Sequence, residues 1–163
     1  MFATASTRHE SKSSLYADLL LQARGLFEGE RDALANSANL SALLFNGLPD
    51  LNWSGFYWLK SDGLVLGAFQ GKPACVRIAL GKGVCGTAAR DRKTIVVPDV
   101  DAFPGHIACD SASRSEIVIP LVHRGAVLGV LDVDSPKLAR FDEEDARGLE
   151  ALATLFIESS DLG

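Results

Sequence analysis

The feature of this sequence that most restricts its fold is a series of β-rich segments joined by very short turns. Residues 53–59 and 64–69 are separated by four turn-forming residues, and residues 116–122 and 126–133 by only three. Strands connected by so few residues can pair only in antiparallel fashion, because a parallel connection needs a dozen or more residues. We therefore predict an antiparallel sheet that contains at least two hairpins.

Helical patterns lie on both sides of these strands. Apolar residues recur at helical spacing after Ser13 or Ser14, either of which is a good N-cap, and again over residues 32–47. A last helix is predicted from Asp142, where acidic residues favour the positive end of the helix dipole. With shorter strands at 75–80 and 94–97, the sheet has five or six strands. The chain is therefore predicted to be an α+β fold, with a flexible tail at 1–13 and one domain at 14–163.

Charge and hydropathy limit the classes of partner. The net charge of -5 disfavours binding to nucleic acid or to an anionic membrane surface. Charges or glycines interrupt every apolar run well before a membrane span, and the N-terminal residues lack the apolar core of a secretory signal. We expect a cytoplasmic protein with no membrane association. Its three cysteines, an odd number, fit that reducing compartment.

A glycine-rich turn, Gly81-Lys82-Gly83-Val84-Cys85-Gly86, matches the dinucleotide-binding pattern G-x-G-x-x-G. A dinucleotide fold also needs repeated parallel βαβ units, which the short turns of this chain exclude. We interpret the glycines as a tight turn that begins a short helix over residues 84–90.

The three cysteines have different surroundings in the sequence. Cys109 lies between His106 and Asp110 in a polar loop over residues 99–115, where a thiol can meet solvent and substrate. A nucleophilic or redox-active thiol is one interpretation, and a simply buried cysteine is the other for any of the three. No two cysteines have zinc-finger spacing, so no metal site is predicted.

Three acidic residues interrupt otherwise apolar strands. Asp132 and Asp134 alternate with apolar residues, so both carboxylates leave the same face of one strand. Glu116 begins the neighbouring strand of the predicted hairpin. The acids are either a solvent-facing polar edge or a convergent group, which would bind a cation or raise the pKa of its members.

Several of these motifs together resemble the free methionine-(R)-sulfoxide reductases, a catalytic branch of the GAF-domain superfamily. The resemblance extends from about Ser14 to the end of the chain and is most specific in the loop that holds Cys109. The residues that carry it are Trp53-Ser54-Gly55-Phe56-Tyr57, Gly83-Val84-Cys85-Gly86, Pro98-Asp99-Val100, Phe103-Pro104-Gly105-His106-Ile107-Ala108-Cys109-Asp110, Ser115-Glu116-Ile117-Val118-Ile119-Pro120 and Leu131-Asp132-Val133-Asp134-Ser135.

The resemblance implies roles for these residues. Cys109 would be the nucleophile, Cys75 the resolving thiol that forms a disulfide with it, and Cys85 an auxiliary thiol. Catalytic and substrate-binding acids would be Glu116, Asp132 and Asp134. The aromatic residues near the substrate's methyl group would be Trp53 and Tyr57.

The resemblance also implies a GAF-like six-stranded antiparallel sheet, flanked by N- and C-terminal helices that form a homodimer. The expected substrate is free methionine-(R)-sulfoxide, with no bound cofactor and with thioredoxin or a similar dithiol as reductant. The alternative is a non-catalytic GAF module that binds a small molecule or senses oxidants through Cys109, and such a module would be expected to carry a fused output domain.

Overall fold

In the computed structural model, which describes residues 9–163, one six-stranded sheet organises the chain. The strand order is β3-β2-β1-β6-β5-β4, and all pairs are antiparallel. The predicted α+β class and the two hairpins are confirmed. The elements are α1 (Lys12–Phe27), α2 (Ala33–Gly47), β1 (Trp53–Lys60), β2 (Gly63–Gly71), β3 (Arg77–Ile78), α3 (Gly83–Asp91), β4 (Ile95–Val97), the 3₁₀ helix η1 (Val100–Ala102), β5 (Ser115–His123), β6 (Ala126–Ser135) and α4 (Glu143–Ser159).

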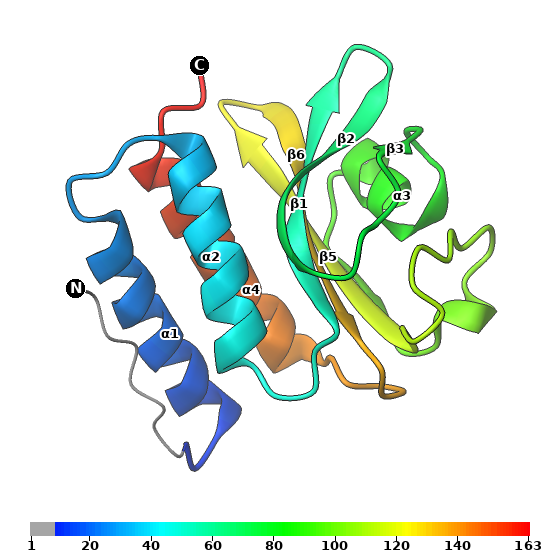
Figure 1. The fold of residues 1–163 in the computed structure, drawn as a ribbon, viewed down its shortest axis with the longest axis horizontal. Coiled ribbons are helices and arrows are strands. Elements are labelled where there is room, and N and C mark those ends of the chain that lie inside the picture. The colour runs from blue at the N-terminus through cyan, green and yellow to red at the C-terminus, as the bar shows by residue number, and fades with distance from the viewer. Residues whose placement is uncertain (1–8) are drawn as a thin grey trace.

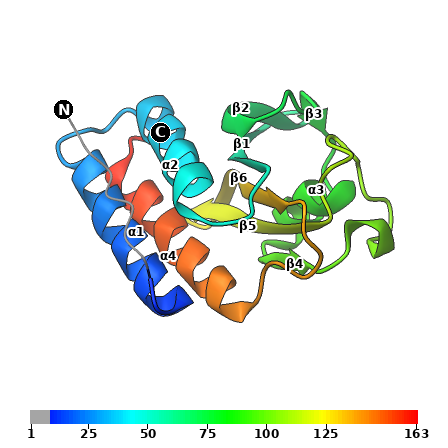
Figure 2. The same ribbon diagram turned by 60° about the horizontal axis from the view of Figure 1, so that its bottom comes forward.

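The helices lie in unequal layers on the two faces of the sheet. In Figures 1 and 2, α1, α2 and α4 cover one face, while α3 and the long loops lie on the other. Helices α2 and α4 pack directly on the strands, and α1 packs on α4 and α2. The main core therefore lies between α2, α4 and the sheet, and includes Phe56, Ile117, Leu131 and Val133. No helix within residues 9–163 has the length and apolar character needed to cross a bilayer.

The period of two along each strand places the predicted functional residues on the face opposite these three helices. Asp134 is directly opposite Glu116 on β5 and Trp53 on β1, and Asp132 is opposite Gly55. Side chains that alternate along a strand leave opposite faces. The face that carries the acids and the aromatic residues is therefore the one that α3 and the loops cover.

The first helix begins earlier than predicted. Ser11, not Ser13 or Ser14, is the N-cap, because its hydroxyl accepts a hydrogen bond from the backbone N–H of Ser14 at 3.1 Å in a capping box. Residues 12 and 13 of the predicted tail are thus helical. Residues 1–8 of that tail lie outside the described part of the chain.

The prediction of a strand over residues 75–80 was wrong in extent, because β3 contains only Arg77 and Ile78. Before it, two side chains from β1 bind the chain. The indole N–H of Trp53 donates to the carbonyl of Lys72, and the Tyr57 hydroxyl donates to the carbonyl of Cys75, both at 3.1 Å. These bonds direct the Lys72 and Cys75 carbonyls to side chains of β1, whereas β3 pairs with β2. At the other end of β3, the Ala79 carbonyl accepts a hydrogen bond from the Lys82 backbone N–H at 3.1 Å, in the turn that follows the strand.

The glycine-rich turn begins α3, as predicted. Gly83 has a φ of 59°, a left-handed conformation that glycine adopts without strain. A Cβ at Gly86 would collide with the carbonyl oxygen of Ala79. The glycines thus let α3 start close to the preceding chain.

Candidate active site

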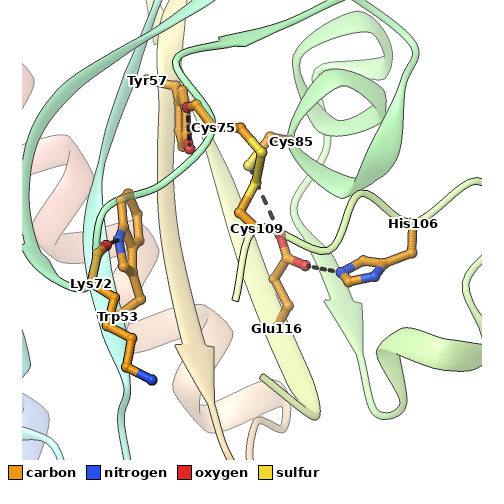
Figure 3. The surroundings of a disulfide bond; sticks show 8 residues. All are labelled: Trp53, Tyr57, Lys72, Cys75, Cys85, His106, Cys109 and Glu116. Carbon is orange, nitrogen blue, oxygen red and sulfur yellow. Dashed lines mark hydrogen bonds and ion pairs between the residues drawn. A yellow bond between two sulfur atoms is a disulfide. The ribbon is translucent and has the colours of Figure 1, made fainter. Parts of the chain in front are cut away.

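A disulfide between Cys75 and Cys109 lies above the acid-bearing face of the sheet (Figure 3). The two Cα atoms are 5.6 Å apart, although 34 residues separate the cysteines in sequence. Both cysteines are partly exposed. This is the pair that the resemblance implied, and it leaves Cys85 as the free, buried thiol of the described chain.

Cys75 is held from below by the aromatic residues of β1. The hydrogen bonds of Trp53 and Tyr57 to the Lys72 and Cys75 carbonyls use the polar atoms of both rings. The rings themselves are buried and stack on each other, with centroids 5.8 Å apart. Both also line the pocket beneath the disulfide, so each contributes to cysteine placement and to the pocket wall.

The loop that holds Cys109 is fixed through the next residue, Asp110. Its carboxylate accepts hydrogen bonds from the Ala112 backbone N–H at 2.9 Å and from the Asn52 amide at 3.2 Å. The first of these bonds is the main cause of the lowered pKa of Asp110. Asn52 also donates to the Ser113 hydroxyl at 2.9 Å. The segment just before β1 thus anchors the Cys109 loop.

Three carboxyl groups converge in the same pocket. Glu116 and Asp132 are each 6% exposed, and Asp134 is partly buried. Burial raises the pKa of all three well above the usual range, and the charge of a second carboxyl raises it further: Asp134 for Glu116, Glu116 for Asp132, and Asp132 for Asp134. The acids are therefore a convergent group and not a solvent-facing edge. Carboxyls of this kind can hold protons near neutral pH.

One buried carboxyl oxygen among the three acids has no hydrogen-bond partner. Asp132 Oδ1 is buried and has no hydrogen-bond partner. A buried acceptor without a partner is costly, so such an atom marks a place where a ligand donor would bind favourably.

Cys85 reaches the acids from α3. Its thiol lies 3.9 Å from Glu116 Oε1 and is only 4% exposed. Burial first, and the negative charge of Asp132 second, raise the pKa of this thiol. Donor atoms of Cys85, Glu116 and Asp132 lie within 4.8 Å of one another, a combination that sequence spacing did not reveal and that could hold a metal ion.

His106 contacts the acid group from the other side. Its Nε2 lies 3.5 Å from Glu116 Oε2, and its side chain is 14% exposed (Figure 3). Burial lowers the pKa of the imidazole, although the charge of Asp101 partly opposes this. The sequence showed only that His106 lies near Cys109 along the chain, and the Glu116 contact appears only in three dimensions.

All eight predicted site residues come together here. The sequence analysis missed the contact of His106 and the anchoring role of Asn52 and Asp110. An aspartate in a loop commonly accepts a hydrogen bond from the backbone N–H two residues later. This tendency could have indicated that Asp110 fixes the loop. The arrangement combines a reversible thiol pair, carboxyls whose pKa values are raised and an aromatic wall, which suits redox chemistry on a small polar substrate.

Comparison with known proteins agrees with this arrangement. The GAF domain family matches residues 37–156. The free methionine-R-sulfoxide reductase of Escherichia coli is 54% identical over 142 residues, which cover 87% of this chain and 86% of that protein.

Two solved structures are also close in fold. A free methionine-R-sulfoxide reductase from Neisseria meningitidis, in complex with its substrate, has a TM-score of 0.93 and 46% identity, over 98% of this chain and 95% of that one. A Burkholderia vietnamiensis protein, described provisionally as a GAF sensor, has a TM-score of 0.89 and 63% identity, over 92% and 96% of the two chains. On its fold, its pocket and these similarities together, the chain belongs to the free methionine-R-sulfoxide reductase family within the GAF-domain superfamily.

Proposed function

We propose that this protein reduces free L-methionine-(R)-sulfoxide to L-methionine at the expense of thiols. The observation that carries the proposal is the Cys75–Cys109 disulfide directly above a pocket of buried carboxyls and stacked aromatic rings. The name of the E. coli relative and the substrate complex of the N. meningitidis structure support the same activity.

The reaction begins with the Cys109 thiolate. It attacks the sulfoxide sulfur while a neutral carboxyl transfers its proton to the sulfoxide oxygen. The hydroxyl so formed passes from the substrate sulfur to the Cys109 sulfur. The sulfur–oxygen bond of the substrate and the new bond between the two sulfurs break, methionine leaves, and Cys109 is left as a sulfenic acid. The Cys75 thiol then attacks the Cys109 sulfur, and water leaves as the disulfide forms. Buried acids serve this chemistry because an unprotonated sulfoxide oxygen is a poor leaving group.

Different residues of the pocket would bind different groups of the substrate. We assign recognition of the ammonium group to Asp132 and Asp134, since Asp132 Oδ1 is a buried acceptor without a partner. Glu116 is the candidate proton donor to the sulfoxide oxygen. Trp53 and Tyr57 would contact the methyl group through the ring atoms that line the pocket, because their polar atoms already bind backbone carbonyls.

The reductant in this proposal is a thioredoxin-type dithiol, which exchanges with the disulfide and restores both thiols. Cys85 would be an auxiliary thiol. A cytoplasmic location and a homodimer through the helical layer remain predictions. The exposed Leu21 of α1 and Leu34 of α2, each 68% exposed, are suited to such an interface.

The test is an assay of methionine formation by purified protein with free L-methionine-(R)-sulfoxide and dithiothreitol. The (S) epimer and a Cys109→Ser variant serve as controls. We expect many turnovers with the (R) epimer alone. A sensor module would instead give no more than one equivalent of methionine, and that result would overturn the proposal.

A further inference from the structure

Glu116 differs from the other two acids in its contacts. Among the described residues it is the one member of the group with a basic side chain at ion-pair distance, since His106 Nε2 lies 3.5 Å from its Oε2. Its other oxygen faces the buried Cys85 thiol. Asp132 and Asp134 have no histidine, lysine or arginine at such a distance within residues 9–163.

The acid that donates the proton to the sulfoxide oxygen is left with a negative charge. Whichever carboxyl protonates the sulfoxide oxygen becomes a carboxylate in a buried site that already holds two other carboxyls. An unpaired charge there is strongly disfavoured. A nearby N–H donor reduces this cost, because hydrogen bonds to charged acceptors are about twice as strong as neutral ones.

We propose that His106 stabilises the carboxylate that Glu116 becomes when it protonates the sulfoxide oxygen, and thereby makes Glu116, rather than Asp132 or Asp134, the proton donor. The inference rests on the proposed function and adds the residue that lets Glu116 act as the acid. His106 acts here through Glu116 and is a positioning residue. In this proposal the imidazole Nε2–H donates to Glu116 Oε2 once the carboxylate forms, from a separation that is already 3.5 Å, and no proton beyond the one passed to the substrate is needed.

The position of His106 fits this role. Its backbone N–H donates to the Phe103 carbonyl at 3.2 Å, so the turn before Cys109 holds it. Figure 3 shows its ring directed at the Glu116 carboxyl on the side away from Cys85. The lowered pKa of the imidazole keeps it neutral near pH 7, when it still has one N–H to donate.

The experiment measures the first turnover of prereduced protein by rapid quench, so that reductant exchange does not contribute. His106→Leu removes the donor at similar volume, and His106→Gln keeps an amide N–H. We expect the leucine variant to form methionine about 10- to 100-fold more slowly, and the glutamine variant to stay within about 5-fold of the original protein. His106→Phe, which keeps a ring but has no N–H to donate, is a second donor-poor variant should the leucine variant misfold. His123→Leu, at the end of β5, is the matched control.

A double-mutant cycle tests whether His106 acts through Glu116. In a Glu116→Gln background no carboxylate forms, so His106→Leu should change the rate by less than about 2-fold. Equal effects of His106→Leu in both backgrounds would overturn the inference, as would wild-type rates in both donor-poor variants. If the unsubstituted protein forms no methionine, the proposed function fails instead, and the two failures are distinguishable.

Discussion

Replacement of Asp132 by asparagine should stabilise the empty protein, and more strongly as the pH rises. The Asp132 carboxyl is buried, its Oδ1 has no partner, and burial and then Glu116 raise its pKa. The same carboxyl titrates near about pH 4 in an unfolded chain. Above that pH the folded state therefore binds more protons than the unfolded state, and stability falls until the folded group ionises.

The magnitude follows from proton linkage. Each carboxyl that stays protonated in the folded state while it is ionised in the unfolded state costs about 1.4 kcal/mol per pH unit. For a chain of this size, that slope corresponds to about 3 to 6 °C in Tm per pH unit. The Asp132→Asn substitution removes one such group.

The assay is thermal unfolding of the reduced protein and of Asp132→Asn, in steps of about one pH unit between about pH 5 and 8. We expect the Tm of the variant to be similar at the acidic end and to exceed the original by several degrees at the alkaline end. Asp62→Asn, which alters an exposed carboxyl paired with Arg77, is the control and should follow the original curve. Parallel curves for Asp132→Asn would refute the reasoning.

Three further predictions concern the reaction. Cys109→Ser should form no methionine even with excess dithiothreitol, because a hydroxyl cannot replace a thiolate as the attacking group at sulfur; residual turnover would contradict the assignment. Cys75→Ser should release one equivalent of methionine and then recycle poorly with thioredoxin, whereas unchanged thioredoxin-dependent turnover would point to Cys85 as the resolving thiol. N-acetylmethionine-(R)-sulfoxide should have a kcat/KM about 30-fold to several-thousand-fold below that of the free amino acid, because acylation removes the ammonium that the acids bind. Comparable values for the two compounds would remove the ammonium-binding role from Asp132 and Asp134.

Local rules explain the parts of this molecule that the sequence determined by itself. Turns of three and four residues allow only antiparallel pairing, and the period of two along β6 places Asp132 and Asp134 on one face whatever surrounds them. The resemblance supplied the cysteine pair, which spacing could not. The glycine-rich turn likewise indicated a close approach of the backbone, which the structure has between Gly86 and the Ala79 carbonyl.

The tertiary structure alone decided how the loops meet. The shortening of β3, the bonds of Trp53 and Tyr57 to residues 72–75, and the anchoring of the Cys109 loop by Asn52 join segments far apart in the chain. The Cys85 and His106 contacts with Glu116 arise in the same way. Loop conformation depends on side-chain hydrogen bonds between such segments, and no pattern of neighbouring residues encodes them. The sequence therefore predicted which acids share the site. The contacts that distinguish Glu116 from Asp132 and Asp134 depend on tertiary packing.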